Sequence, residues 1–116
     1  MKVLILAAGY ATRLYPRTIH FPKPLLEVNK KPIIEYLIEK VRQLQDVSKV
    51  IVVTNARFAD TFKKWAKGLK IPLKIEIVND LTRSPEDRLG AVGDMHLVFK
   101  RESFRGDFLV MGGDNF

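Results

Sequence analysis

The sequence predicts an α/β fold built on an open parallel sheet. Strand-like and helix-like segments alternate along the whole chain, and two strand-like segments, residues 3–6 and 50–53, are uninterrupted aliphatic runs. A strand without polar alternation is typical of a parallel sheet that helices cover on both faces. Alternating strands and helices are also the pattern of right-handed crossover connections between parallel strands.

The first strand is followed by a long loop and a helix. Residues 3–6 form the strand, and residues 10–31, which contain three prolines, form the loop. Residues 32–45 form an amphipathic helix, with Pro32 in its first turn, where a missing N–H is tolerated. The apolar residues at helical spacing are Ile33, Ile34, Leu37, Ile38, Val41 and Leu44.

The second strand, residues 50–53, leads into a second helix. Thr54 and Asn55 serve as turn and cap, and Gly68 ends the helix. This helix has one aromatic face, formed by Phe58, Phe62 and Trp65. Because their spacing is that of a buried helix face, we interpret the three rings as core residues rather than as a stacking platform.

The second half of the chain adds two strands and a third helix. Residues 73–78 alternate between apolar and polar, which predicts a strand that is solvated on one face. Residues 79–88 form a polar loop, and residues 107–111 form the fourth strand. Gly90 and Gly93 weaken the intervening helix. Its apolar face would consist of Leu89, Val92, His96 and Phe99.

The element order β-α-β-α-β-α-β predicts a Rossmann-like, three-layer α/β/α architecture. With the first strand in the centre, the strand order is 3-2-1-4, and the winding direction reverses between strands 1 and 4. Ligands of open α/β sheets bind at such a reversal, outside the carboxyl ends of the strands. The residues expected there are Gly9, Arg13, Lys23, Gly112, Gly113 and Asp114.

Composition narrows the classes of function. Lys and Arg number 20 and Asp and Glu 13, and the resulting net charge of +7 favours an anionic partner such as a nucleotide, a nucleic acid or phosphate. The absence of cysteine excludes disulfides, zinc–thiolate sites and a cysteine nucleophile. No apolar run approaches the ~18 residues that span a membrane, and no signal-peptide pattern is present. We expect a cytoplasmic protein with one domain, residues 1–116.

The segment from Gly9 to Lys23 has the composition of a phosphate-binding loop. Glycine lets backbone N–H groups approach a phosphate, and Arg13 can hold two phosphate oxygens at once. Pro22 and Pro24 restrict the backbone on both sides of Lys23. The segment is neither G-x-G-x-x-G nor a P-loop, which disfavours dinucleotide binding and Walker-type ATP hydrolysis.

Two further places carry candidate site residues. Asp114 follows a strand end and two glycines, where a carboxylate either holds Mg²⁺ or is an ordinary turn residue. A magnesium site needs a second carboxylate, for which the candidates are Asp80, Glu86, Asp87 and Asp94. Asn79 and the glycines of residues 88–93 either contact a nucleotide base or form an ordinary loop and helix entry.

These motifs resemble those of the sugar-1-phosphate nucleotidyltransferases. The segment LILAAGYATRLYPRTIHFPKPLLEVNKKPIIEY is similar to the family signature, RLGAVGDM to its base-binding segment, and VMGGDNF to its G-D-N metal motif. The match covers all 116 residues. The resemblance implies that a sugar 1-phosphate attacks the α-phosphorus of a nucleoside triphosphate, so that pyrophosphate leaves and a nucleotide-sugar forms.

The resemblance also implies roles for individual residues. Arg13 would hold the leaving phosphates, and Lys23 would neutralise charge on the α-phosphate. Asn79 and Gly90 would contact the base, and Asp114 would bind Mg²⁺. The nucleotide would be cradled by Ala7, Ala8, Gly9, Tyr10, Ala11 and Thr12. No nucleophilic side chain is needed, because the sugar phosphate is already an anion; catalysis rests on positioning and charge.

Two departures from the family pattern matter. Ala11 stands where the family has a second glycine, and alanine disfavours positive φ. Family members are also substantially longer, and their sugar site lies beyond the G-D-N motif. We therefore expect an N-terminal nucleotide-binding part that lacks normal transferase activity alone and works with a complementing C-terminal half or as a homo-oligomer.

Other functions remain open at this stage. One is transfer to a different phosphorylated alcohol, such as phosphocholine or an inositol phosphate. Another is a non-catalytic nucleotide-binding or regulatory module. A nucleic-acid-binding domain is favoured by net charge alone, since the chain has no helix dense in Lys and Arg. We expect neither nucleic acid nor membrane as a partner.

Overall fold

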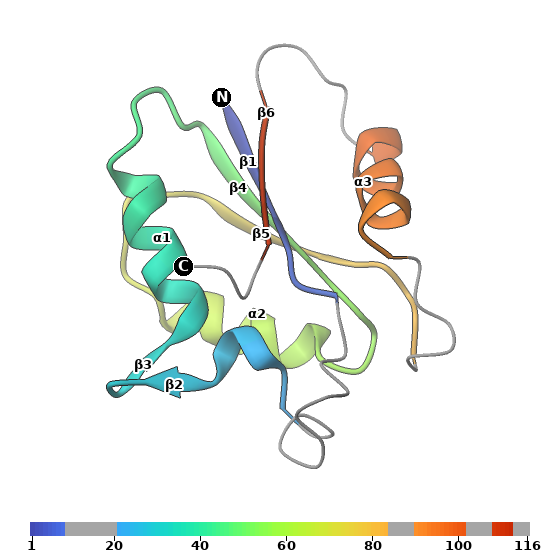
Figure 1. Ribbon diagram of the computed structural model, residues 1–116, viewed down its shortest axis with the longest axis horizontal. Coiled ribbons are helices and arrows are strands. Elements are labelled where there is room, and N and C mark those ends of the chain that lie inside the picture. Colours follow the sequence, from blue (N-terminus) through green and yellow to red (C-terminus); the bar gives the residue numbers. More distant parts are fainter. Residues whose placement is uncertain (9–20, 84–89, 102–107, 113–116) are drawn as a thin grey trace.

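The computed structural model describes residues 1–8, 21–83, 90–101 and 108–112. A four-stranded parallel sheet is the centre of this part of the chain (Figure 1). Its strands are β1 (Lys2–Leu6), β4 (Lys49–Thr54), β5 (Ile75–Asn79) and β6 (Phe108–Gly112). The helices are α1 (Ile33–Arg42), α2 (Ala59–Gly68) and α3 (Gly90–Arg101). None of the helices in the described ranges is both long enough and apolar enough to cross a membrane.

The strand order β5-β4-β1-β6 confirms the predicted order 3-2-1-4. All pairings are parallel, and β1 lies between β4 and β6. The register pairs Leu6 with Val53 on one side and with Gly112 on the other. The aliphatic run of β1 predicted a central strand, because only a strand with neighbours on both edges and helices on both faces is buried throughout. With β1 in this position, the winding direction reverses between β1 and β6.

Helices cover both faces of the sheet, which confirms the three-layer arrangement. Figure 1 shows α1 and α2 on one side and α3 on the other. Alternate residues of β1 separate the two cores, since Val3 and Ile5 pack with α1 and α2, whereas Leu4 packs with α3. Phe58 and Phe62 are buried in the first core, as the aromatic spacing predicted. Trp65 packs against them and meets Phe62 edge to face at 6.4 Å.

Helix α1 is shorter than its apolar pattern predicted. It ends at Arg42, and Leu44 lies beyond it with 41% of its surface exposed. The last turn tightens, because the N–H of Leu44 donates to the carbonyl of Val41 at 3.0 Å. Asp46 then adopts a positive φ of 63°, and Ser48 N–H bonds to the carbonyl of Met1. The connection to the start of the sheet thus ends the helix before Leu44 can be buried.

The predicted loop of residues 10–31 contains structure that the sequence reading missed. A 3₁₀ turn, η2 (Lys23–Leu25), precedes a two-stranded ribbon of β2 (Glu27–Val28) and β3 (Lys31–Pro32). Asn29 and Lys30 link its strands with φ values of 55° and 65°, the conformation of a type I′ hairpin turn. Pro32 is consequently the N-cap of α1 and lies outside the helix, where it was not expected.

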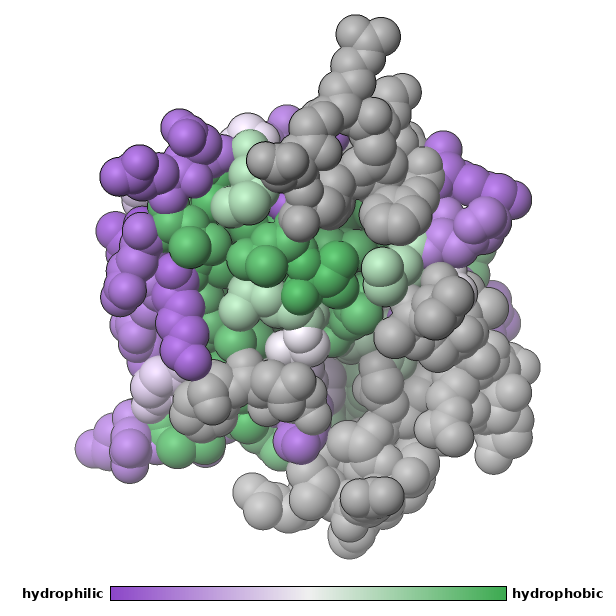
Figure 2. Space-filling model, turned by 45° about the horizontal axis from the view of Figure 1, so that its top comes forward, coloured by the Kyte–Doolittle hydropathy of each residue, from purple (hydrophilic) through white to green (hydrophobic). Residues whose placement is uncertain are grey.

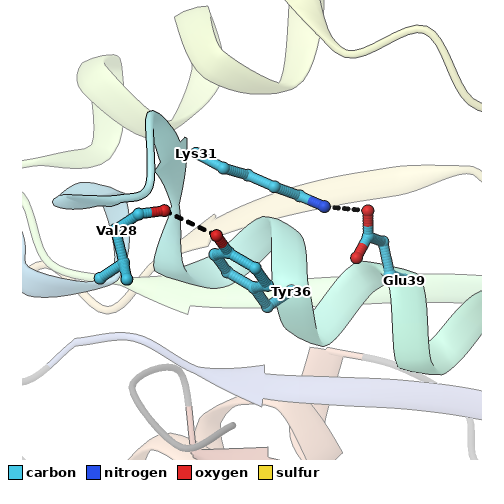
Figure 3. A network of polar contacts seen from close by, with 4 residues as sticks. All are labelled: Val28, Lys31, Tyr36 and Glu39. Carbon is cyan, nitrogen blue, oxygen red and sulfur yellow. Dashed lines mark hydrogen bonds and ion pairs between the residues drawn. The ribbon is translucent and has the colours of Figure 1, made fainter.

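The ribbon is fastened to α1 by polar contacts (Figure 3). The hydroxyl of Tyr36 donates to the carbonyl of Val28 at 2.6 Å. Lys31 forms an ion pair with Glu39 one turn further along the helix, and its ammonium lies 4.7 Å from the centre of the Tyr36 ring. These contacts hold the ribbon, which follows η2 in the chain, against a helix that packs on the sheet.

The surface in Figure 2 is uneven in polarity. Hydrophobic side chains gather in the middle of this face, and hydrophilic side chains lie on both sides of it. Strand β6 is an edge strand within the described part of the sheet, and its Val110 is 38% exposed. An edge strand with an exposed apolar side chain is a typical place for further polypeptide to pack.

Candidate functional site

The carboxyl ends of three strands are joined by backbone hydrogen bonds beyond the sheet itself. Ala7 N–H donates to the carbonyl of Val53 at 2.7 Å, and Asp80 N–H donates to that of Thr54 at 2.7 Å. Ala56 N–H donates to the carbonyl of Thr82 at 2.8 Å. The exits of β1, β4 and β5 are therefore held at fixed positions relative to one another, as a binding edge requires.

Asn55 adds a side-chain link at this edge. It is fully buried, its Nδ2 donates to the carbonyl of Ala8 at 3.1 Å, and its Oδ1 accepts from Phe58 N–H at 3.0 Å. The second contact closes the turn before α2, but the prediction of Asn55 as the helix cap was wrong, because the helix begins at Ala59 with Phe58 as its N-cap and no side-chain cap. The first contact was missed, although a single asparagine directly after a buried aliphatic strand is a usable signal for a polar link at a strand end.

The structure brings together the two strand ends from which the motif-bearing segments continue. Leu6 and Gly112 are register partners, so the chain leaves β1 and β6 at adjacent positions. Ala7 and Ala8, two predicted nucleotide-binding residues, are both buried at the exit of β1. The predicted residues that lie outside the described part of the chain are Gly9, Tyr10, Ala11, Thr12, Arg13, Gly113 and Asp114. Their roles stay predictions.

Lys23 begins the η2 turn, and the backbone around it is firmly held. Pro22 and Pro24 are both buried, and Leu25 is 4% exposed in the main core. Leu26 N–H donates to the carbonyl of Lys23 at 3.0 Å. This agrees with the expectation that the two proline rings restrict the backbone at Lys23. The structure shows a second restraint, which is the burial of the neighbouring side chains in the core.

Asn79 and Gly90 lie at the ends of two different elements. Asn79 is the last residue of β5, and its Oδ1 accepts from Leu81 N–H at 2.8 Å. Leu81 has a φ of 70° and is 74% exposed. The Asn79 carbonyl oxygen thus shapes its own turn, and contact with a base edge would fall to Nδ2. Gly90 is the first residue of α3.

A buried pair of aspartates joins the same two elements. Asp80 directly follows β5, Asp94 lies one turn into α3, and they are only 6% and 4% exposed. Asp80 Oδ1 accepts from the backbone N–H and the hydroxyl of Thr82, at 2.9 and 2.7 Å. Burial, together with a hydrogen bond to Asp80 and its negative charge, raises the pKa of Asp94 to about 8.

Asp80 and Asp94 were two of the candidates for the second magnesium carboxylate, and that role stays a prediction. A metal ligand must be deprotonated, and burial beside Asp80 raises the pKa of Asp94, so a cation that bound here would have to displace its proton. The other two candidates, Glu86 and Asp87, lie outside the described residues. Within the described ranges no three acidic, histidine or cysteine side chains form a group that could hold a metal ion.

Comparisons with known proteins identify the family. The model of the nucleotidyl transferase family matches residues 2–116. A "Bifunctional protein GlmU" of Methanococcus maripaludis is 34% identical over 98% of this chain and 25% of its own length. A "Mannose-1-phosphate guanyltransferase" of Saccharomyces cerevisiae is 33% identical over 98% of this chain and 30% of its own length.

A solved structure agrees with this assignment. The CTP:phosphocholine cytidylyltransferase of Streptococcus pneumoniae (LicC) superposes with a TM-score of 0.72 and 29% identity, over 99% of this chain and 45% of that one. The chain therefore spans less than half of that protein and about a quarter to a third of these curated relatives. With the family model matched along nearly the whole sequence, the chain belongs to the nucleotidyl transferase family.

Proposed function

We propose that the chain is the nucleotide-binding part of an enzyme that transfers a nucleoside monophosphate from a nucleoside triphosphate to a sugar 1-phosphate. Pyrophosphate is released and a nucleotide-sugar forms. The observation that carries this proposal is the pairing of Leu6 with Gly112, which sets side by side the two strand ends from which the motif-bearing segments continue. Family membership and the named activities of the relatives support it.

In the proposed reaction this chain binds and orients the triphosphate. Backbone groups after Ala8 face its phosphates, Arg13 holds the leaving phosphates, and Lys23 offsets the negative charge that develops at the α-phosphate. Lys23 suits this role because its backbone is held before the substrate arrives, which lowers the entropic cost of positioning it. Asp114 would hold Mg²⁺, which when bound supplies further positive charge at the phosphates.

A second acceptor class has specific support. The superposed LicC structure is that of a CTP:phosphocholine cytidylyltransferase. Phosphocholine, like a sugar 1-phosphate, offers a phosphate anion as the nucleophile, so the same nucleotide site serves both acceptors. We propose the sugar 1-phosphate as the first candidate, because a curated relative named as a mannose-1-phosphate guanyltransferase is 33% identical.

The nucleotide site is tested by titrating the four nucleoside triphosphates with Mg²⁺ into the 116-residue chain by calorimetry. We expect at least one to bind, and Lys23→Ala to weaken that binding by about 10- to 100-fold, as expected for losing a charge-assisted contact. Lys70→Ala removes the same charge at an exposed position before β5 and should bind like the wild type. Binding of polynucleotide instead of triphosphate would overturn the proposal.

The acceptor is tested by pyrophosphate release in the presence of the protein, the preferred triphosphate and either a sugar 1-phosphate or phosphocholine. If the 116-residue chain binds the triphosphate without turnover, a longer polypeptide that includes it is assayed in the same way. Turnover with a sugar 1-phosphate supports the first candidate, and turnover with phosphocholine alone supports the second.

A further inference from the structure

The aspartate pair lies between the two segments that the proposed function assigns to the nucleotide base. Asp80 is the neighbour of Asn79 at the end of β5, and Asp94 stands four residues after Gly90, one helical turn along α3. Aspartate is rarely buried unless it is paired, yet both side chains are almost fully buried here. The burial of two adjacent carboxyl groups therefore needs a physical explanation.

The hydrogen-bond pattern supplies that reason. Thr82 occupies Asp80 Oδ1 with two donors, whereas Asp80 Oδ2 and Asp94 Oδ1 are buried and receive no hydrogen bond from any N–H or hydroxyl of the described residues. Two ionised carboxylates in contact would repel each other strongly in such surroundings. One proton held between the two carboxyl groups removes the repulsion and provides the missing hydrogen bond.

Most of the described charged side chains on the elements around the pair are exposed. On α3, His96 and Lys100 are exposed, and so are Arg57 and Arg83 in the loops after β4 and β5. On the sheet face beneath α3, Glu76 forms an ion pair with Lys49 toward the other end of the strands. Asp80 is the charged group that acts on Asp94.

We propose that Asp80 and Asp94 form a clamp that shares one proton and holds the first turns of α3 against the end of β5, so that Asn79 and Gly90 are positioned for the nucleotide base. This inference rests on the proposed function. Both residues are positioning residues and need not touch the nucleotide. Thr82 extends the clamp to the turn before α2, because its hydroxyl bonds to Asp80 and its carbonyl accepts from Ala56 N–H.

Because the clamp depends on a proton, its effect should change with pH, whereas that of a contact without a titrating group should not. Loss of the shared proton as the pH rises through about 8 leaves two adjacent carboxylates, which should loosen the contact between α3 and β5. An asparagine in place of Asp94 keeps a neutral hydrogen-bond donor that does not titrate. An alanine removes the contact altogether.

The test compares wild type, Asp94→Asn and Asp94→Ala by calorimetry with the preferred triphosphate and Mg²⁺ at pH 7 and pH 9.5. We expect wild-type affinity to fall about tenfold or more at the higher pH, Asp94→Asn to keep the pH 7 affinity at both, and Asp94→Ala to be weak at both. Asp60→Asn makes the same chemical change at an exposed position of α2 and should follow the wild type. Equal affinities of wild type and Asp94→Ala at both pH values would overturn the clamp.

Thermal unfolding without nucleotide provides a second, independent readout. We expect Asp94→Asn to unfold at a higher temperature than wild type at pH 9.5, whether or not any triphosphate binds. If wild type binds no triphosphate but this rescue occurs, the proposed function fails and the paired carboxyl groups stand. If Mg²⁺ alone raises the unfolding temperature of wild type but not of Asp94→Asn, the pair is a metal site and the clamp is refuted.

Discussion

The buried amide of Asn55 donates a 3.1 Å hydrogen bond to the carbonyl of Ala8, the last described residue before the predicted phosphate loop. The same side chain accepts a hydrogen bond from Phe58 N–H before α2. One residue thus ties the exit of the central strand to the start of a helix on the neighbouring strand. Both of its partners are backbone groups, so a side chain without an amide would leave the carbonyl of Ala8 without this donor.

Replacing Asn55 should therefore destabilise the fold and the loop exit together. We expect Asn55→Ala to lower the free energy of unfolding by about 1–3 kcal/mol, since the carbonyl of Ala8 loses this donor and the N–H of Phe58 keeps only its 3.3 Å bond to the backbone carbonyl of residue 55. Asn55→Asp should be at least as harmful, because an oxygen would then face the carbonyl of Ala8. Urea unfolding measures both. Gln43→Ala, which removes an exposed amide after α1, should change stability by less than about 0.5 kcal/mol.

The buried side chain of Leu25 should help to position Lys23, the lysine that the proposed mechanism uses. Leu25→Ala removes the side chain that anchors η2 in the core and should cost about 2–4 kcal/mol of stability. Because Lys23 begins this turn, triphosphate affinity should also fall, although Leu25 is not expected to touch the nucleotide. Leu44→Ala is the matched control at a 41% exposed position and should leave stability and affinity close to wild type. Unchanged affinity in a folded Leu25→Ala protein would contradict the anchoring role.

The ribbon turn offers a stabilising change. Lys30 has a φ of 65°, which an L-residue adopts only with strain, and Asn-Gly is a preferred sequence for a type I′ turn. Lys30→Gly should therefore raise the free energy of unfolding by roughly 0.5–1 kcal/mol. Lys40→Gly, the same substitution within helix α1, should lower it by about 1 kcal/mol. Two changes of equal sign in urea unfolding would show that the turn is not strained at Lys30.

Stability should depend on pH through Asp94. Its pKa rises to about 8 on folding, so the native state binds the proton more tightly than the unfolded chain does. Below pH ~4 both states are protonated and the group contributes no slope. Between about pH 4 and pH 8 only the unfolded chain releases the proton, so stability falls as the pH rises, and above pH 8 the dependence ends.

The Asp94→Asn variant should remove this slope. Unfolding free energies of wild type and variant, measured in urea at pH 5, 7 and 9, should differ increasingly up to about pH 8 and by a constant amount beyond it. Asp60→Asn should run parallel to the wild type. A difference that grows toward low pH would mean that folding lowers the pKa of Asp94 and would contradict the buried pair.

Much of the fold was predictable, because its signals are local. The aliphatic runs of β1 and β4 indicate burial on both faces, and the helical spacing that leads to Phe62 predicts the face that α2 buries. The strand order followed from the crossover rules once β1 was placed in the centre. The restricted backbone around Lys23 was predictable, because its two flanking prolines act through the covalent chain.

Other features were not predictable, because their partners are distant in the sequence. Helix α1 stops before Leu44 because a tight turn must return the chain to the start of the sheet. The ribbon depends on two positive φ values and on the hydroxyl of Tyr36 on α1. None of these contacts changes the local pattern of polar and apolar residues from which helices and strands are predicted.

The sequence by itself determined the parallel sheet, its order, the family and the residues expected to meet the phosphates, since these follow from periodicity, glycine and proline positions and motif spacing. Only the tertiary structure decided that Asn55 reaches Ala8 and that Asp80 meets Asp94. The sequence around an isolated polar residue does not indicate which distant residue will become its hydrogen-bond partner. The partner is chosen when the sheet and the helices pack, because a buried polar atom must find its hydrogen bond within the space that remains.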